Sequence, residues 1–485
     1  MITFLICLAV LIIGYFTYGR VTEKIMGPDD KNITPAHRLA DGVDYVVLPW
    51  HKVLLTQFLN IAGLGPIFGA VMGAMFGPVV FLWITLGTLF IGGVHDMITS
   101  YVSLKHDGIA LSELVGIYLG KWGKRVMLFF TVILSILVGV VFTMSPAGWL
   151  NSRIEWGMHT WIIIIMIYYV FATLVPVKTI MAKLFPLFSF SMLLMCVVLF
   201  IAMMWNQFTN PTFSMVEFTF NTVHPAMLSP LPFLFVTVAC GAVSGFHAAK
   251  SPMMVRCLNK ESQTKKVFFG AMVIEGIVAL VWAAVAMAVL GDTFWGDNPT
   301  TVGALGGAGV LVDQISYELL GGAGVFLVII AVIIVPITTG DTTFRSLRIT
   351  LADTFKFSQA SMMNRILLCI PMFATAFVLT FINFDILWRY FAWTNQTIAA
   401  LALWTCAAWL TANKKIHWIA SLPAMLLTYV SFSYILQAPE EGFGLSAMIG
   451  NSVGISAAIL AMVVFLFLRP KERLDFPSNA VLKGK

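Results

Sequence analysis

Long apolar segments separated by short polar loops run through the whole chain. Thirteen of these segments approach the roughly 20 residues that an α-helix needs to cross a bilayer. They are residues 1–19, 53–76, 78–104, 126–145, 160–176, 184–205, 230–249, 267–290, 325–344, 366–382, 388–411, 416–436 and 446–468. The loops between them are too short to hold a soluble domain. The pattern therefore predicts an all-α polytopic membrane protein with thirteen transmembrane helices.

Basic residues gather in alternate loops. If the N-terminus lies outside the cell, 27 of the 29 Lys and Arg residues fall in cytoplasmic segments, and only Arg153 and Arg389 lie outside. Cytoplasmic loops retain an excess of these residues. Residues 1–19 have neither the basic N-terminal region nor the cleavage site of a signal peptide, so we interpret them as a retained transmembrane helix. The distribution predicts a multi-pass protein of a prokaryotic cell membrane, with its N-terminus outside and a cytoplasmic tail at 469–485.

Composition agrees with the lipid bilayer as the main partner. The chain is 59% hydrophobic and 11% charged, whereas soluble domains are about 25% charged. The net charge of +6 resides in the loops, so it reflects topology and predicts no nucleic-acid surface. Six scattered cysteines show no ligand spacing, and we expect no metal site. Motifs of phosphate loops, zinc hydrolases and nucleophilic enzymes do not occur in the sequence, so we expect no enzyme.

Two of the predicted helices contain glycine and proline at positions where a lipid-facing helix would avoid them. The first is interrupted at Gly63, Gly65 and Pro66, and the second at Gly241 and Gly245. Both interruptions fall roughly 15 Å inside their apolar segments, near the bilayer midplane. For either helix alone, close packing or a simple kink is the alternative interpretation.

The positions of the two interruptions indicate an inverted repeat. After an N-terminal anchor helix at 1–19, they open two five-helix halves, 53–205 and 230–411, which enter the membrane from opposite sides. Two additional helices at 416–468 and the tail at 469–485 complete the chain. Matching broken helices in inverted halves are typical of secondary transporters, which bind substrate at the unwound backbone.

We expect the substrate site at these two interruptions. Unpaired backbone groups at midplane depth are tolerated only against protein, water or a ligand. The candidate substrate-binding residues are Gln57, Asn60, Gly63, Gly65, Pro66, Gly241, Ser244, Gly245 and His247. For His247, substrate contact or proton carriage stands beside the alternative of an interior histidine bonded within the protein.

A hydroxyl-rich segment with one carboxylate is a candidate for ion coupling. Thr338, Thr339 and Thr342 surround Asp341 at the inner end of a predicted helix. Oxygen ligands of this kind bind hard cations, and an intramembrane carboxylate can carry a proton. The alternative is an ion pair between Asp341 and Arg345, four residues apart.

Two further carboxylates lie inside predicted helices. Glu275 is the deepest one without an obvious partner, and Asp96 follows His95 near the inner end of its helix. Ionisable residues inside a membrane mark ion pathways by default, so Glu275 and Asp96 join the ion-coupling candidates. A Ser or Thr contact for Glu275 and a structural His95–Asp96 pair are the alternatives. Asn395 and Gln396 either line the pathway or bond to a neighbouring helix.

Several short motifs resemble the carbon starvation protein (CstA) family. They are Asp-Gly-Val-Asp-Tyr at 41–45, Ile-Ala-Gly-Leu-Gly-Pro-Ile at 61–67, Asp-Gly at 107–108 with Ser-Glu-Leu at 112–114, Gly-Ala-Val-Ser-Gly-Phe-His at 241–247, Thr-Thr-Gly-Asp-Thr at 338–342, and Trp-Arg-Tyr-Phe at 388–391 with Asn-Gln at 395–396. The resemblance implies uptake of peptides or pyruvate during nutrient limitation. It also implies a fold similar to the amino acid–polyamine–organocation superfamily, with its five-plus-five inverted repeat.

The chain departs from this family beside the expected site. Thr56 and Gln57 stand where the family has two histidines, and Lys250 lies in a segment that differs after the second interruption. These changes leave the substrate and the coupling ion open. Lys250 either helps to hold an anionic substrate or anchors its loop at the inner surface.

Together these features predict an ion-coupled symporter that imports a small carboxylate-bearing nutrient, such as pyruvate or a short peptide. Protons or sodium would drive it, and no other cofactor is expected. A passive channel or uniporter would use the same helices without accumulating substrate. A membrane-embedded nutrient sensor would need a cytoplasmic partner surface, for which the inner loops are short. The oligomeric state is open.

Overall fold

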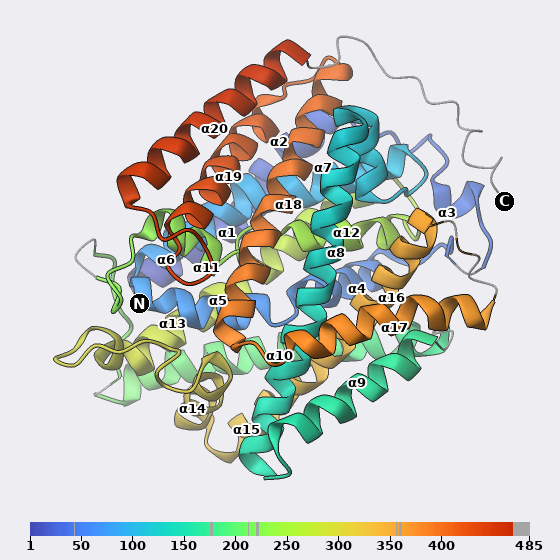
Figure 1. The fold of residues 1–485 in the computed structure, drawn as a ribbon. Helices are drawn as coiled ribbons and strands as arrows, with labels where there is room; N and C mark the ends of the chain where they lie inside the picture. Colours follow the sequence, from blue (N-terminus) through green and yellow to red (C-terminus); the bar gives the residue numbers. More distant parts are fainter. Residues whose placement is uncertain are drawn as a thin grey trace.

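The computed structural model describes residues 1–468 apart from 43, 175–177, 212, 220–222, 356 and 358–360 (Figure 1). All regular structure in these residues is helical, which confirms the predicted all-α class. The predicted tail at 469–485 and Val43 of the 41–45 motif lie outside the described residues.

Twenty α-helices and five short 3-10 or π-helical segments follow one another along the described chain. They are α1 (Ile2–Phe16), α2 (Tyr18–Met26), α3 (Pro35–Arg38), α4 (Trp50–Ala62), α5 (Gly65–Gly73), η1 (Ala74–Phe76), α6 (Val79–Gly87), η2 (Thr88–Gly92), α7 (Gly93–Lys105), α8 (Leu111–Arg153), α9 (Met158–Leu174), α10 (Lys178–Thr209), η3 (Pro230–Leu234), α11 (Phe235–Thr237), α12 (Gly245–Val255), η4 (Lys265–Phe269), α13 (Gly270–Trp295), α14 (Ala308–Leu320), α15 (Gly322–Val328), η5 (Ile329–Ile334), α16 (Val335–Phe355), α17 (Met362–Leu379), α18 (Phe384–Ala412), α19 (Trp418–Gln437) and α20 (Ala447–Leu468).

Each of the thirteen predicted segments coincides with a helix or with consecutive helices. Among the described residues, eight helices are long and apolar enough to cross a membrane, and the bent pair α4–α5 makes a ninth span. α9 is apolar but shorter. The predicted segments 230–249, 325–344 and 388–411 correspond to α11–α12, α15–α16 and α18, which carry breaks or polar residues that lower their hydropathy. The chain is therefore a polytopic helical membrane protein.

Some helix bounds differ from the predicted ones. The first helical region runs over Ile2–Met26 and not only over 1–19, because α2 continues α1 past Thr17. α8 begins at Leu111, inside the predicted loop 105–125, and bends at Gly120, whose φ of 83° suits glycine. The predicted outer loop 291–324 contains α14.

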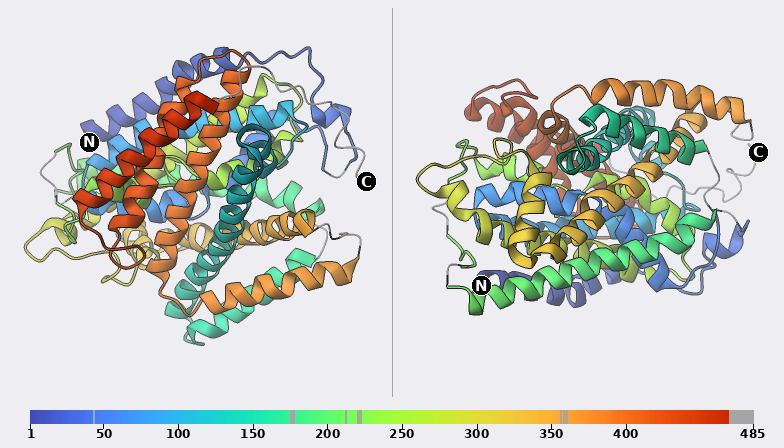
Figure 2. Two further views of the ribbon diagram at one scale, coloured as in Figure 1. Left: turned by 45° about the horizontal axis from the view of Figure 1, so that its top comes forward. Right: turned by 90° about the horizontal axis from the view of Figure 1, so that it is seen from below.

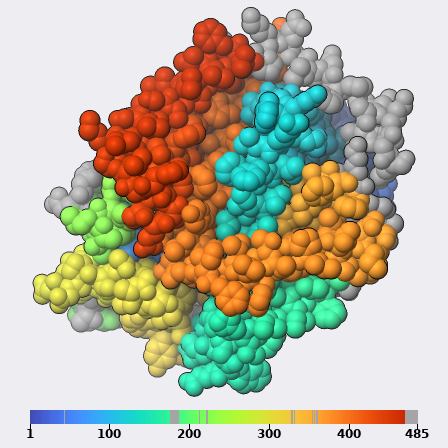
Figure 3. All heavy atoms as spheres, viewed as in Figure 1, coloured from blue at the N-terminus to red at the C-terminus, as the bar shows by residue number. Residues whose placement is uncertain are grey.

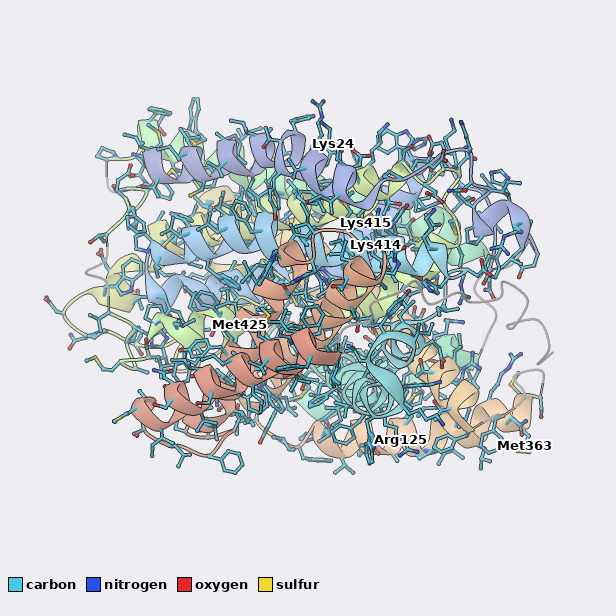
Figure 4. The ribbon with its side chains drawn as sticks, turned by 90° about the horizontal axis from the view of Figure 1, so that it is seen from above. Lys24, Arg125, Met363, Lys414, Lys415 and Met425 are labelled. Carbon is cyan, nitrogen blue, oxygen red and sulfur yellow. The ribbon has the colours of Figure 1, made fainter. Side chains whose placement is uncertain are left out.

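Loops predicted to be cytoplasmic contact one another at one end of the molecule, which we call the inner face. Thr34 donates to the carbonyl of Leu258 at 2.7 Å. The Tyr45 hydroxyl donates to the carbonyl of Asp107 at 2.9 Å. Lys415 donates to the carbonyl of Met26, and Figure 4 shows Lys414 and Lys415 beside one another. The predicted cytoplasmic location of this face stays a prediction.

Loops predicted to lie outside meet at the opposite end, the outer face (Figure 1). The N-terminal amine pairs with Glu217 at 2.7 Å. The Trp295 indole donates to the carbonyl of Met75 at 3.0 Å. Arg153 pairs with Asp313. Segments predicted to share a side therefore do share a face of the structure.

The two interrupted helices lie among the other helices, while several apolar helices form the periphery (Figure 2). α10 forms one edge, and α20, α17, α8 and α9 lie at the surface in Figure 3. In the most apolar stretch of α20 22% of the residues are buried, against 78% in α13. The exposed apolar side chains of α20 therefore face lipid, and α13 is a central helix.

Candidate functional site

The first interruption, which we call the first break, separates α4 from α5 at Gly63 and Leu64. The two helices meet at 47°. Gly63 has φ 11° and ψ −140°, a conformation that ends α4, and Pro66 in the first turn of α5 supplies no backbone N–H. The glycines and proline predicted from sequence to interrupt this helix do so.

The second break comprises residues 238–244, between α11 and α12. The chain leaves the helix after Thr237 and resumes it at Gly245, with Ser244 in an extended conformation as the N-cap. Because the non-helical stretch is seven residues long, more backbone groups lose their helical partners here than at the first break.

Side chains from neighbouring helices accept or donate hydrogen bonds at the second break. Asn395 Oδ1 accepts from the N–H of Phe246 at 2.8 Å and from the Ser244 hydroxyl at 3.0 Å. Gln396 donates to the carbonyl of Phe235 at 2.6 Å. Of the two alternatives for Asn395 and Gln396, bonding to a neighbouring helix is the one observed. The polar pair in α18 therefore caps α12 and fixes the end of α11.

Two residues of the α6–η2 region complete this support. The Trp83 indole donates to the carbonyl of Val238 at 3.1 Å, and the Thr88 hydroxyl donates to the carbonyl of Gly241 at 3.1 Å. Sequence reasoning did not find Trp83 or Thr88. Nothing in their local sequence marks them, because each is one polar group in an apolar helix.

The two breaks touch each other. A β-carbon placed on Gly65 would lie 2.1 Å from Cβ of Cys240, and one on Gly241 would lie 2.7 Å from Cβ of Ala279. One on Gly69 would lie 3.0 Å from the carbonyl oxygen of Thr237. Side chains at these positions would force the helices apart. Of the predicted substrate-site glycines, Gly65 and Gly241 therefore lie at the crossing of the two interrupted helices, whereas Gly63 packs on Phe142 of α8 and Gly245 on α18.

Polar groups on the inner side of the first break have fewer partners. Gln57 donates to Ser251 at 3.1 Å, but its Oε1 has no hydrogen-bond partner. Asn60 Nδ2 and Thr339 Oγ1 are also buried without a partner. Thr339 comes from α16, and its methyl carbon would lie 3.9 Å from a β-carbon at Gly63. α4 packs on both α12 and α16, so these groups belong to one region.

Lys250 lies on α12, beside Ser251. Its side chain is 3% exposed, and its Nζ has no hydrogen-bond partner. Nζ lies 5.1 Å from the ring centre of Phe246, a cation–π contact. Lys250 and Asp341 interact electrostatically. The predicted role as a surface anchor does not match this burial.

His247 stands at the centre of a second, fully buried polar group. Its Nδ1 is 2.9 Å from Asp96 Oδ2, and its Nε2 is 3.2 Å from Glu275 Oε2. His95 Nδ1 is 2.7 Å from Asp96 Oδ1. All four side chains are 0% exposed. Glu275 is therefore paired with a histidine rather than with the Ser or Thr that the sequence suggested.

The structure divides the predicted ion-coupling residues between two places. Asp96 and Glu275 contact His247, whereas Asp341 pairs with Arg345 at 3.1 Å, as the i, i+4 spacing had suggested. Around Asp341, Thr338 and Thr342 donate to carbonyls of their own helix, which leaves the lone pairs of their hydroxyl oxygens available as acceptors. Within the described residues, no group of three or more His, Cys, Asp or Glu is arranged to hold a metal ion.

Two pockets open on the outer face. One of 640 Å³ reaches Val236 and Thr237, directly before the second break, and one of 600 Å³ is lined by α8 and α14. Burial lowers the pKa of His224, which lines the larger pocket, to about 4, so this imidazole is neutral near pH 7. Arg389, one of the two basic residues predicted to lie outside, pairs here with Glu441 at 3.0 Å.

Interrupted helices that cross near buried charged groups, in a polytopic helical bundle, define the class of membrane proteins with a transporter-type fold. A crystal structure of an Eremococcus coleocola manganese transporter shares this fold, with a TM-score of 0.57 at 12% identity, over 89% of this chain and 98% of that one. This likeness concerns the fold alone.

The chain belongs to the family described as carbon starvation protein CstA, whose family model matches residues 1–158 and 133–302. It is 37% identical to an uncharacterized membrane protein of Haemophilus influenzae, over 59% of this chain and 91% of that protein. It is 27% identical to the peptide transporter CstA of Bacillus subtilis, over 96% of this chain and 85% of that one. The match to the peptide transporter CstA of Escherichia coli is 25% identical and covers 48% of that protein.

Proposed function

We propose that this chain is a secondary active transporter of the cell membrane that uses an ion gradient to import a small carboxylate-bearing nutrient. Relatives across this family are named peptide transporters, and a solved metal-ion transporter has a similar fold. We expect the substrate to bind at the first break and no cofactor to be needed beyond the coupling ion.

The observation that carries this proposal is the buried, unpartnered ammonium of Lys250. A buried charge is costly unless it is paired and hydrogen-bonded. Asp341, the carboxylate that acts on Lys250, already pairs with Arg345. Lys250, Asp341 and Arg345 together carry a net charge of about +1 when all are ionised. One substrate carboxylate would supply the missing counter-charge.

The neighbouring groups are suited to the rest of a small substrate. Asn60 Nδ2 and Thr339 Oγ1 can donate hydrogen bonds, and Gln57 Oε1 can accept one. A 2-oxo or hydroxyl oxygen would meet the donors, and the ammonium or amide N–H of a dipeptide would meet the Gln57 oxygen. The site therefore favours a substrate with one carboxylate and one further polar group.

Uptake into proteoliposomes tests the proposal. Labelled pyruvate and a labelled dipeptide would be supplied separately, with an imposed proton or sodium gradient. We expect accumulation of at least one of them above its outside concentration, with saturation. Equilibration without accumulation would contradict the proposal and favour a channel or uniporter. Absence of any uptake by folded protein in sealed vesicles would contradict the substrate class.

Variants of Lys250 test the proposed site itself. Lys250→Met keeps the length and burial of the side chain but removes the charge, so uptake should fall to the level of protein-free vesicles. Lys250→Arg should retain part of it, because the charge remains. Lys414→Met, at an exposed lysine of the inner face, is the matched control and should transport normally. Full uptake by Lys250→Met would place the substrate elsewhere.

A further inference from the structure

The buried group around His247 has an unbalanced charge. Asp96 and Glu275 both face this one imidazole, at 2.9 Å and 3.2 Å. With both carboxylates ionised, His247 doubly protonated and His95 carrying only the ring proton that faces Asp96, the four side chains carry a net charge of about −1. Since none of them is exposed, this excess charge lies in a low-dielectric interior, where it is unfavourable. One additional proton would neutralise the group.

From this geometry we infer that Asp96, His247 and Glu275 form the site that binds the coupling proton. The inference rests on the proposed function and names its driving ion. Glu275 is the open position of the site, because neither of its carboxylate oxygens has a hydrogen bond in optimal geometry, whereas both oxygens of Asp96 contact a histidine. A proton therefore enters on Glu275 or between it and Nε2 of His247.

The groups around this site come from α7, α13, the second break and α4. Glu275 on α13 and Asp96 on α7 are the charges that act on His247. Behind them, His95 bonds to Asp96, and the Cys240 thiol of the second break lies 3.8 Å from the Ser244 hydroxyl. From α4, the uncharged amide of Gln57 bonds to Ser251, whose hydroxyl in turn donates to the backbone carbonyl of His247.

The site formed by Asp96, His247 and Glu275 is poorly suited to bind a sodium ion. Sodium ions in such transporters bind to freed carbonyl and other oxygen ligands. The carbonyls of Phe235, Val238 and Gly241 at the second break already accept hydrogen bonds from side chains. Two imidazole rings occupy the oxygens of Asp96, so of the two carboxylates in this site only Glu275 has oxygens without a hydrogen bond.

The position of the site explains how a proton could affect the substrate region. His247 lies in the first turn of α12, directly after the second break. Glu275 lies one turn before Ala279 on α13, and Ala279 contacts Gly241. The outer pocket of 640 Å³ reaches Thr237 at the other end of the break. A change in the protonation of this site would therefore act on the region where α11, α12 and the first break meet.

The two buried groups also have complementary charges. The Lys250 group carries about +1 and the His247 group about −1, and both are on or against α12. A monoanionic substrate with one proton would neutralise both together. Proton and substrate would therefore favour each other's binding.

Substrate-driven proton movement in proteoliposomes tests the inference. Vesicles containing a pH-sensitive dye would receive the substrate found for the wild-type protein, and labelled exchange against unlabelled substrate would be measured in parallel. Wild-type protein should acidify the vesicles. Glu275→Gln should give no acidification and no uphill uptake, but should still exchange substrate, with little dependence on pH between about 6 and 8.

Controls make each outcome decisive. Glu113→Gln, at an exposed carboxylate, should behave as wild type. Proton movement retained by Glu275→Gln, or lost in Asp341→Asn instead, would overturn the inference while leaving the transporter proposal intact. Loss of exchange in folded Glu275→Gln would also overturn it, because the carboxylate would then serve translocation itself. If Glu275→Gln does not fold, Asp96→Asn takes its place with the same expectations. Failure of exchange by wild type would instead defeat the proposed function.

Discussion

The two interrupted helices are alike in sequence but differ in how the protein supports them. At the second break, Asn395, Gln396, Trp83 and Thr88 bond to the exposed backbone and to the cap of α12. At the first break, Asn60 and its neighbours keep buried polar atoms without a partner. Side chains therefore bond the backbone of the second break, although Gln396 Oε1 there also has no partner, whereas we propose that the unpartnered groups at the first break bind a ligand.

Because of this difference, we expect the second break to contribute to stability and the first break to contribute to transport. A buried hydrogen bond contributes to stability, and its loss leaves a costly unsatisfied group. An unpartnered polar group makes no hydrogen bond that its removal could cost. We therefore expect substitutions at the second break to lower stability and those at the first break to lower transport.

The largest loss of stability should come from Asn395→Leu. The change leaves the Phe246 N–H and the Ser244 hydroxyl without their acceptor, at about 1–3 kcal/mol for each buried donor. Thermal unfolding in detergent would show a clear fall in Tm. An unchanged Tm would mean that the cap of α12 does not depend on this side chain.

Gly65→Ala should have the next largest effect, since its β-carbon would clash with Cys240 at 2.1 Å. Overpacking of this kind costs about 1–3 kcal/mol. The double variant with Cys240→Gly should recover much of the loss, because the contacted side chain is removed. Gly322→Ala, where a β-carbon meets nothing within 4 Å, is the control. Equal Tm values for all of them would contradict a close crossing.

Thr88→Val should be milder. It removes one hydrogen bond to the carbonyl of Gly241, worth about 1 kcal/mol, and keeps the shape of the side chain. Thr375→Val, at an exposed threonine that bonds only within its own helix, serves as its control and should have a smaller effect. A loss for Thr375→Val as large as that for Thr88→Val would remove the distinction.

Asn60→Leu should change stability least, by about 0.5 kcal/mol or less, because no hydrogen bond is lost. Uptake, however, should fall strongly if this amide binds substrate. A drop in Tm comparable to that of Asn395→Leu would show that the first break is also held by its side chains, and the comparison between the breaks would fail.

The sequence predicted the helices well because the bilayer imposes both their length and their apolar character. Glycines likewise marked both breaks, and Pro66 marked the first, since their effect on the backbone is local. The Asp341–Arg345 pair was also accessible, because i, i+4 neighbours share a helix face.

Contacts between distant helices were not predictable in this way. Asp96 and Glu275 were each recognised as buried carboxylates, but their meeting at His247 depends on how α7, α12 and α13 are rotated against one another. α7 and α13 are buried on most sides, so no boundary between an exposed and a buried face fixes that rotation. The burial of Lys250 was missed for the same reason, because a lysine after a break also suits the membrane surface.

The close approach of Gly65 to Cys240 gives the protein a native chemical reporter. All six cysteines are buried, so none should react readily with a polar maleimide in the compact state described. Any state that separates α5 from the second break would expose the Cys240 sulfur at the centre of the membrane. In a variant that keeps only this cysteine, the alkylation rate would measure how often the crossing opens, and substrate or acid would change that rate without any probe being attached beforehand.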